Sequence, residues 1–337
     1  MPDDPKGASL AGAFFHDALL PVAVPPIAAA PIIAGTYRPA AVLHIVHGMA
    51  EHGGRYGRLA KKLCDSGVEV WAADQRGHGR TARNGGNDPG KGGLPGHTSD
   101  CDAFDRVAAD LEAINLAIRA ARPGVPLFLL GHSWGSFIAQ HYISQGRSDA
   151  AAVDGCALSG TRGPGSAKAK AGAPFMATLS ALKGRRAASP AARAVVEGPY
   201  QKAFRPARTT HDWLSRDEAE VDAYIADPLC GMLCSVGFYQ DLAKGLLRIH
   251  RPEAIARIPV DLPIYIFCGD ADPVGDSGAS PRALVGAYSE AGIKNLEFTP
   301  YPGARHEPLN ETNRDEASAA LLSWILRRAQ GRDEGKK

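Results

Sequence analysis

Short apolar segments alternate with helical patterns along most of this 337-residue chain, and this alternation limits the folds open to it. The short segments, which read as buried strands, are 41–48, 68–75, 126–132, 153–160, 263–270 and 295–302. Between them, apolar residues recur at helical spacing. Repeated strand–helix units predict an α/β fold whose mostly parallel central sheet carries helices on both faces.

The interval 162–256 breaks this rhythm. From Arg162 to Arg208 it holds ten Lys or Arg residues and a single acid, Glu197. The stretch "SRDE" at 215–218 then fits a helix-starting capping box. We therefore expect a helical cap, or lid, inserted over the sheet.

The domain plan follows from this interruption. Residues 41–161 and 257–330 form the predicted core, and 162–256 form the cap. Residues 1–40 are expected to be an irregular segment packed on the core, and 331–337 a flexible tail.

Charge and cysteine content limit the partners and the compartment. The formal net charge is +2, which gives no reason to expect nucleic acid as a partner. The six cysteines lack the spacing of a disulfide framework, so a reducing, cytoplasmic setting is predicted. The apolar stretch 18–35 contains four prolines and follows a non-basic start, which argues against a targeting or spanning segment. The basic part of the cap is expected to be a solvated face, while a transient contact of the cap with an anionic membrane surface stays open.

The sequence Gly131-His132-Ser133-Trp134-Gly135 follows the predicted strand 126–132 and opens a helical pattern. An ordinary strand-to-helix turn is the simpler interpretation, because the G-x-S-x-G pattern alone is weak evidence in a glycine-rich chain. Its position between strand and helix is, however, the context in which the glycines hold a serine hydroxyl clear of the backbone. We predict that Ser133 is a nucleophile and that the N–H of Trp134 donates to the developing oxyanion.

A serine nucleophile needs a base and an acid that follow it in the chain. His306 lies in a loop after the last predicted strand, where the base is expected. The segment "GDADPVGD" offers Asp270, Asp272 and Asp276 for the acid. We favour Asp272, because Asp270 comes directly off the strand and could instead cap the loop. The second oxyanion donor is expected in the loop after 41–48, where Met49 is the candidate.

Several spaced blocks then point to a family. "HGMAEHGGRY", "DQRGHGRT", "LLGHSWGS", "SRDEAEVDAYIADPLCG", "GDADPVGD" and "ARHE" together resemble the monoacylglycerol lipase and lysophospholipase branch of the α/β-hydrolases, over residues 41–327. The resemblance implies the α/β-hydrolase fold, with Ser133 as nucleophile, His306 as base and Asp272 as acid. It places the oxyanion donors at Met49 and Trp134.

The resemblance also implies a reaction. It predicts a serine hydrolase that cleaves monoacylglycerol-like or other lipid carboxylic esters through an acyl-enzyme, without a cofactor and with a small-molecule ester or lipid as its partner. Lysophospholipases, aminopeptidases and other hydrolases share the superfamily, and a non-catalytic binding protein is a further alternative. Acyl-chain length, physiological substrate and oligomeric state stay open.

Two features bear on the acyl site. The chain has Trp134 where the family commonly has methionine after the nucleophile, which would narrow an acyl pocket. The family's opening hairpin is hard to find in 1–40, so an irregular sheet edge is expected. Apolar residues of the cap are the candidate wall for an acyl chain, the alternative being a core internal to the cap; they are Phe175, Met176, Leu179, Leu229 and Phe238.

Two further motifs are set aside. "GGNDPGKGG" at 85–93 resembles a phosphate-binding loop, but glycine occupies the position of its metal-binding hydroxyl and no strand immediately precedes it. His44, His47 and His52 are explained by a strand and the loop that follows it, so no metal site is predicted.

Overall fold

A seven-stranded parallel sheet forms the centre of the computed structural model, which describes residues 13–16, 38–85, 88, 93–146, 151–165 and 167–334. The strand order is β1-β3-β2-β4-β5-β6-β7, and each neighbouring pair runs in parallel. The strands are β1 (Ala13–His16), β2 (Ala41–Val46), β3 (Val68–Ala73), β4 (Leu127–His132), β5 (Gly155–Ser159), β6 (Ile264–Gly269) and β7 (Leu296–Tyr301). The predicted α/β class with a mostly parallel sheet is confirmed.

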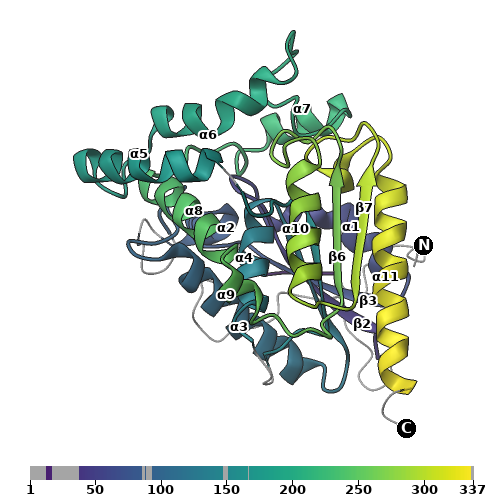
Figure 1. Ribbon diagram of the computed structural model, residues 1–337. Helices are drawn as coiled ribbons and strands as arrows, with labels where there is room; N and C mark the ends of the chain where they lie inside the picture. The colour runs from purple at the N-terminus through teal and green to yellow at the C-terminus, as the bar shows by residue number, and fades with distance from the viewer. Residues whose placement is uncertain are drawn as a thin grey trace.

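Helices follow most strands and cover the sheet (Figure 1). The α-helices are α1 (Gly57–Asp65), α2 (Gly79–Asn84), α3 (Ala103–Ala121), α4 (Trp134–Ile143), α5 (Ala167–Lys183), α6 (Pro190–Lys202), α7 (Glu218–Ala226), α8 (Val236–Ile249), α9 (Pro252–Ile255), α10 (Ala279–Glu290) and α11 (Arg314–Glu334). In the described part of the chain, short 3₁₀ helices are formed by η1 (Gly53–Tyr56) and η3 (Pro308–Asn310).

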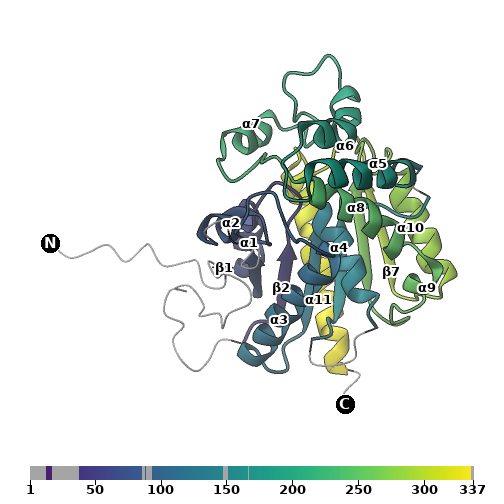
Figure 2. The same ribbon diagram turned by 90° about the vertical axis from the view of Figure 1, so that its left-hand side faces the viewer.

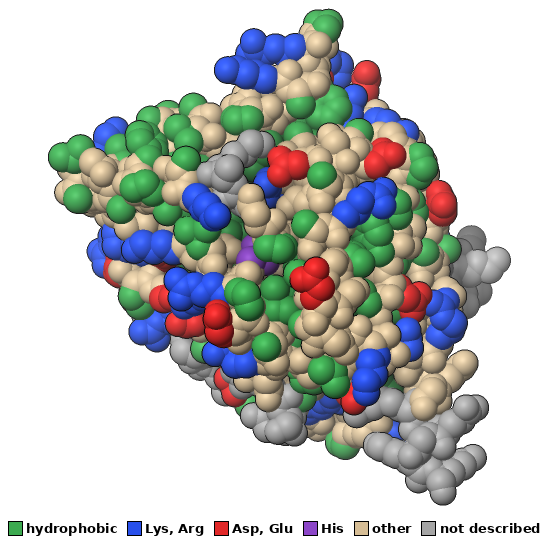
Figure 3. Space-filling model, viewed as in Figure 1, with side chains coloured by type: hydrophobic (Ala, Val, Ile, Leu, Met, Phe, Trp, Pro, Cys, Tyr) green, Lys and Arg blue, Asp and Glu red, His purple; other side chains and the backbone are tan. Residues whose placement is uncertain are grey.

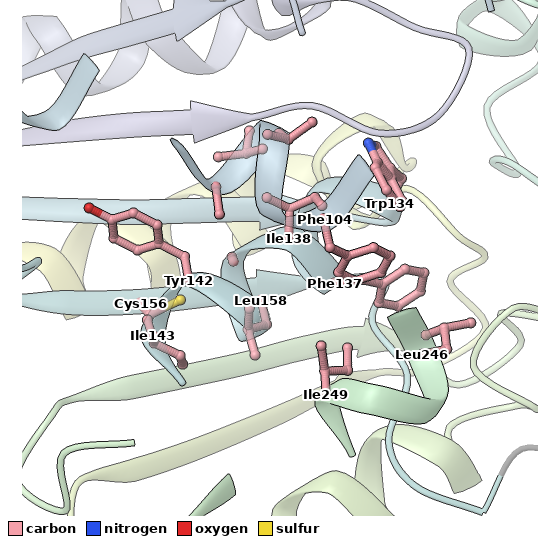
Figure 4. Packing of buried hydrophobic residues seen from close by; sticks show 14 of the residues in the cluster. Phe104, Trp134, Phe137, Ile138, Tyr142, Ile143, Cys156, Leu158, Leu246 and Ile249 are labelled. Atoms are coloured by element: carbon pink, nitrogen blue, oxygen red, sulfur yellow. The ribbon is translucent and has the colours of Figure 1, made fainter. Parts of the chain in front are cut away.

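Alternation along the strands divides the core between the two faces of the sheet. In β4, Leu129 packs with helices α3, α4, α8 and α10, whereas its neighbours Phe128 and Leu130 pack with α1 and α11. Figure 4 shows the first of these clusters, which joins Phe104 of α3, Phe137 of α4 and Ile249 of α8 to Leu158 of β5. Strands buried on both faces explain why the sequence shows continuous apolar runs rather than alternation with polar residues.

The insertion between β5 and β6 divides into two parts. Helices α5, α6 and α7 lie over the end of the sheet toward which the strands point (Figures 1 and 2). Helix α8, which the sequence analysis assigned to the cap, contacts α5 of the insertion most extensively, but it also contacts α3 and α4 and contributes Phe238 and Leu246 to the core cluster. Its apolar face is wide enough to complete the layer on that side of the sheet.

Helix α7 begins two residues later than the capping-box interpretation places it. Asp217, rather than Ser215, is the N-cap, and its carboxylate accepts from the N–H of Ala219. The Ser215 hydroxyl donates to the carbonyl of Asn310 instead. The Ser215 hydroxyl, which the capping-box pattern assigns to the helix start, is therefore used in a tertiary contact with Asn310.

The two ends of the chain relate differently to the predictions. Most of the expected N-terminal segment, including the apolar stretch 18–35, lies outside the described residues, apart from β1, which pairs with β3. At the other end, α11 continues to Glu334, four residues into the predicted tail. Among the helices in the described part of the chain, none combines the length and apolarity needed to cross a membrane.

Candidate active site

Ser133 occupies a strained turn between β4 and α4. Its φ of 51° and ψ of −121° lie in a region that non-glycine residues rarely adopt. The flanking glycines make the turn sterically feasible: a Cβ on Gly135 would lie 2.0 Å from the carbonyl oxygen of Val46, and one on Gly131 would lie 2.5 Å from that of Gly135. The turn therefore holds the Ser133 side chain where the sequence predicted an exposed nucleophile.

The structure brings Ser133, His306 and Asp272 together in one hydrogen-bonded chain. The Ser133 Oγ lies 2.8 Å from Nε2 of His306, whose Nδ1 lies 3.0 Å from Oδ2 of Asp272. Asp272 is fully buried and His306 is 2% exposed. This is the arrangement in which a carboxylate orients an imidazole that takes the proton of a serine hydroxyl.

Asp270 and Asp272 have different environments. Asp270 is exposed, and its Oδ1 accepts from the N–H of Gly303 at 2.6 Å. It thus caps the loop after β7, as the alternative interpretation of this residue anticipated, while only Asp272 contacts His306.

Opposing effects set the protonation of the imidazole. Burial acts to lower the pKa of His306, but the charge of Asp272 and its hydrogen bond outweigh burial and raise it. The ring of His132 lies 5.0 Å from that of His306, and burial followed by the charge of His306 lowers the pKa of His132 to about 4. His132 therefore stays neutral at neutral pH and does not repel the imidazolium that proton transfer would form.

The loop after β2 places Met49 beside Ser133 and His306 in a small pocket. Ala50 has a φ of 55°, and its carbonyl accepts from the hydroxyl of Tyr224 and from the N–H of Gly231, both in the cap insertion. The N–H of Trp134, the residue after Ser133 in the chain, is in the first turn of α4 and lacks an intrahelical partner by position. Both predicted oxyanion donors thus border the serine.

An ion network that the sequence analysis missed lies beneath this loop. Arg55 donates two hydrogen bonds to Glu307 and one to Glu51, and all three side chains are at most 9% exposed. Glu51 also accepts from the N–H of Gly48. Burial alone would raise the pKa of Glu51, but Arg55 and His132 lower it to about 2. Glu51 and Arg55 both lie in the block "EHGGRY", which the sequence analysis used only for the family resemblance. Their opposite charges four residues apart were the sequence signal for part of this network.

Loss of Arg55 should make the protein less stable to unfolding. Arg55→Met leaves two buried carboxylates without their cation, which should lower the free energy of unfolding by about 3–5 kcal/mol. Arg58→Met is the matched control, since Arg58 pairs with Glu220 at the surface and should cost at most about 1 kcal/mol. Urea denaturation measures both, and equal losses in the two variants would contradict a special role for the buried network.

The cap forms the roof over the histidine. The N–H groups of His306 and Glu307 donate to the carbonyls of Trp213 and Leu214, and the ring of Trp213 lies 5.1 Å from that of His306. Arg193 and Glu197 of α6 line the same pocket, and Glu197 accepts from both Arg193 and Tyr239. None of these cap residues was anticipated from the sequence, because they depend on how the insertion folds back.

A larger apolar cavity of about 490 Å³ lies next to this roof. The ring of Tyr200, which lies in the cavity wall, is 5.3 Å from the ring of Trp213 and tilted against it, and Trp213 in turn lines the pocket of Ser133. The other lining residues come from α4, α5, α6, α8 and the loops after β5 and β6; they are Phe137, Arg162, Ala171, Gly172, Phe175, Met176, Val195, Val196, Pro199, Tyr239, Leu242, Ala243, Leu246 and Val274.

Two of the five predicted acyl-wall residues, Phe175 and Met176, line this cavity. The other three do not. Leu179 packs against the core cluster, and Phe238 is 1% exposed and contacts the ring of Trp134 at 4.9 Å. Leu229 lies outside the cavity wall, in the turn after α7.

Trp134 does not narrow the acyl pocket as its size suggested. Its indole N–H donates to Gln75, and its ring packs on Phe104 and Phe238. The side chain is 1% exposed and lines neither pocket described above. The bulk of Trp134 therefore fills the core rather than the substrate space.

His52, Asp227 and Cys230 lie close enough to suggest a metal-binding cluster. The hydrogen bonds indicate another role. Nδ1 of His52 accepts from the N–H of Gly54, so Nε2 carries the proton and donates to Asp227 at 2.8 Å. A ring nitrogen that donates a proton has no lone pair for a metal. The cluster instead ties the oxyanion loop to the cap.

The fold defines the class of protein: an α/β-hydrolase with a helical cap insertion. Solved structures agree. A thermostable carboxyl esterase from Bacillus coagulans, solved in complex with glycerol, has a TM-score of 0.76 and 28% identity, covering 87% of this chain and 91% of that chain. A monoacylglycerol lipase from Paleococcus ferrophilus, at a TM-score of 0.62 and 24% identity, covers 86% of this chain and 96% of its own and supports the fold alone.

The family follows from the sequence. The family model described as "Serine aminopeptidase, S33" matches residues 37–313, and the chain belongs to this family. Its relatives include a monoacylglycerol lipase from Mycolicibacterium smegmatis, which is 27% identical over 86% of this chain and 89% of that protein. The monoglyceride lipase of Homo sapiens is 28% identical over 80% of this chain and 77% of that protein.

Proposed function

We propose that this protein is a serine ester hydrolase that cleaves amphiphilic esters, of the monoacylglycerol type, through an acyl-enzyme. The observation that carries the proposal is the hydrogen-bonded chain from Ser133 through His306 to Asp272, whose Ser133 and His306 line a polar pocket next to an apolar cavity. Ser133 attacks the ester carbonyl, and His306 takes its proton and returns it to the leaving alcohol. The N–H groups of Met49 and Trp134 stabilise the oxyanion.

The apolar cavity supports an acyl chain as the buried part of the substrate. Its volume of about 490 Å³ lies within the range of small-molecule pockets, and most of its wall is aliphatic or aromatic. Each methylene moved from water into such a wall contributes about 0.8 kcal/mol. A chain that enters here passes Tyr200, which borders both the cavity and the catalytic roof.

The polar pocket supports a small neutral alcohol as the leaving group. Glu197, the carboxylate in the roof, is already paired with Arg193 and accepts from Tyr239. An aminopeptidase must bind a free ammonium group, and a carboxylate engaged in this way is poorly suited to that task. The free hydroxyl groups of a polyhydric alcohol such as glycerol can still form hydrogen bonds with these paired side chains.

The outer face of the cap is compatible with a lipid source of substrate. Phe175 and Leu182 of α5 are 44% and 79% exposed, and hydrophobic side chains are frequent over this helix at the upper left of Figure 3. Lys183 adjoins them in sequence. These features support a transient contact with a lipid surface.

A substrate panel tests the function directly. It combines p-nitrophenyl esters of graded chain length, glycerol monoesters, a lysophospholipid and aminoacyl anilides. We expect the highest kcat/KM for glycerol monoesters and medium or long acyl chains. Preferred hydrolysis of the anilides would replace the proposal with an aminopeptidase, and preferred hydrolysis of the lysophospholipid would replace the alcohol assigned here.

Filling the cavity should change chain-length preference. Val196→Trp places an indole in the cavity wall, which should displace two or three methylenes and lower kcat/KM for long chains by about 30-fold. Butyrate esters should be affected less than about threefold, since a short chain needs little of the cavity. Leu116→Trp at an exposed position of α3, away from the cavity wall, is the control. An unchanged long-to-short ratio in Val196→Trp would show that the chain binds elsewhere.

A further inference from the structure

The loop that carries Asp272 is held in an unfavourable backbone conformation. Asp276, Ser277 and Gly278 all have positive φ, at 48°, 53° and 83°. For the two non-glycine residues this costs about 1–3 kcal/mol each, so neighbouring structure must stabilise the loop. The N–H of Ser277 donates to the carbonyl of Asp272, which closes the loop on itself at 2.8 Å.

Arg162 provides support from outside the loop. It follows β5, a neighbouring strand of the sheet, and its side chain is 5% exposed. Its Nη1 donates to the carbonyl of Val274, and its Nη2 donates to Oδ2 of Asp276 at 2.5 Å. One guanidinium therefore binds two points of the loop, including one of its left-handed residues.

Val274 connects this support to the triad. Its N–H donates to Oδ1 of Asp272 at 2.8 Å, while its carbonyl accepts from Arg162. The other carboxylate oxygen, Oδ2, faces Nδ1 of His306. The contacts thus run from Arg162 through the backbone of Val274 to Asp272. The rotation of the Asp272 carboxylate therefore depends on where the Val274 backbone lies.

Arg162 is itself firmly placed. Its carbonyl accepts from Nε2 of Gln140 on α4, at 3.1 Å, and lies 3.1 Å from Nε2 of His250. The N–H of the next residue, Gly163, donates to the hydroxyl of Ser280 at the start of α10. The arginine therefore transmits the position of the core to the Asp272 loop rather than moving with that loop.

We propose that Arg162 is a positioning residue for the triad, holding the Asp272 carboxylate in the orientation that His306 requires. The inference rests on the proposed hydrolase function, because its effect is expressed through Ser133. Arg162 does not touch the serine or the imidazole; it acts through Val274 and Asp276.

The charges around His306 determine what its titration can report. The groups that face or influence it are Asp272, Glu51, Glu307 and His132, and Arg55 neutralises the two glutamates. Weaker bonding to Asp272 would lower the pKa of His306, since burial then dominates. Simple removal of a nearby positive charge would raise it. The two explanations of an Arg162 variant therefore predict opposite shifts.

The experiment compares three variants by steady-state kinetics with p-nitrophenyl butyrate, whose short chain makes little use of the cavity that Arg162 also lines. They are Arg162→Met, Arg162→Lys and the control Arg119→Met. Like Arg162, Arg119 donates both to the backbone and to a carboxylate: its acceptors are the carbonyls of Val125 and Ala152 and the carboxylate of Asp154, near the opposite ends of the strands. Thermal melting of each variant separates lost stability from lost catalysis.

We expect Arg162→Met to lower kcat by about 10- to 100-fold, as a misplaced catalytic group does, with KM changed less than about threefold. The acidic limb of kcat/KM should move to lower pH. Arg162→Lys keeps the charge but binds fewer acceptors, so its kcat should fall between those of Arg162→Met and the wild type. Arg119→Met should retain the wild-type kcat and pH profile below its melting temperature.

Three results would overturn the proposal: a kcat in folded Arg162→Met equal to that of Arg119→Met, a loss confined to KM, or an acidic limb that stays in place or moves to higher pH. Where Arg162→Met does not fold, Arg162→Lys decides by the same pH criterion. An error in the proposed serine hydrolase function would give a different result: ester hydrolysis would survive Ser133→Ala in an otherwise wild-type protein.

Discussion

Replacing Ser133 by alanine should lower kcat for ester hydrolysis by about 10⁴- to 10⁶-fold, the loss seen when a triad nucleophile is removed. The hydroxyl lies 2.8 Å from Nε2 of His306 and sits at the strained turn between β4 and α4, so no neighbouring group can replace it in the same geometry. The fold should persist, since alanine is smaller than serine and, among the described residues, the Ser133 hydroxyl hydrogen-bonds only to His306. Circular dichroism and melting temperature check the fold, and the initial rate with p-nitrophenyl butyrate checks the chemistry.

Covalent labelling provides an independent measurement of the same prediction. A fluorophosphonate should modify Ser133 in the wild type and should leave the alanine variant unlabelled. Ser66, an exposed serine whose hydroxyl donates to the carbonyl of Lys62, serves as a control position, and Ser66→Ala should label normally. Ordinary turnover by Ser133→Ala, or labelling of another serine, would end the assignment of the nucleophile.

Asp272→Asn should lower kcat by about 10⁴-fold, because an amide can donate to Nδ1 and so favours the wrong tautomer of the imidazole. Asp270→Asn should stay within about threefold of the wild type. Asp270 is exposed and only accepts from the N–H of Gly303, a role that the amide oxygen of asparagine can also fill. The two variants change the same chemical group two residues apart, so each controls for the other.

The pH profile sharpens this comparison. The charge and hydrogen bond of Asp272 raise the pKa of His306 against the effect of burial, so Asp272→Asn should move the acidic limb of kcat/KM to lower pH in whatever activity remains. Asp270→Asn should leave that limb in place. A larger loss in Asp270→Asn than in Asp272→Asn would mean that the acid of this site is misassigned.

The local signals in the sequence were sufficient for the scaffold and for the candidate triad. Strands buried on both faces leave continuous apolar runs, and each of the six predicted from 41 onward contains the observed strand. Ser133 could be found because its glycine-flanked turn follows a buried strand and opens a helix, which is the setting in which such a turn exposes a nucleophile. His306 and Asp272 could be chosen because a parallel sheet brings the loops at the carboxyl ends of its strands to one edge.

The cap could be recognised from the sequence but not resolved in detail. The break in the strand–helix rhythm marked 162–256, yet helical spacing alone did not show that α8 adds side chains to the core cluster and, together with α5 and α6, lines the cavity. Apolar residues at helical spacing look alike whether they face a core or a substrate. That ambiguity explains why the predicted acyl wall combined Phe175 and Met176, which line the cavity, with Phe238 and Leu229, which do not.

By itself, the sequence determined which chemical groups are available and at which edge of the sheet they gather, because strand period, turn glycines and chain order are local properties. Only the tertiary structure decided how these groups are supported. The pairing of Arg55 with Glu307, and the reach of Arg162 to the Asp272 loop, join segments 252 and 114 residues apart. Such contacts leave no periodic trace in the sequence, since they depend on the burial of charge between loops that meet only when the sheet is complete.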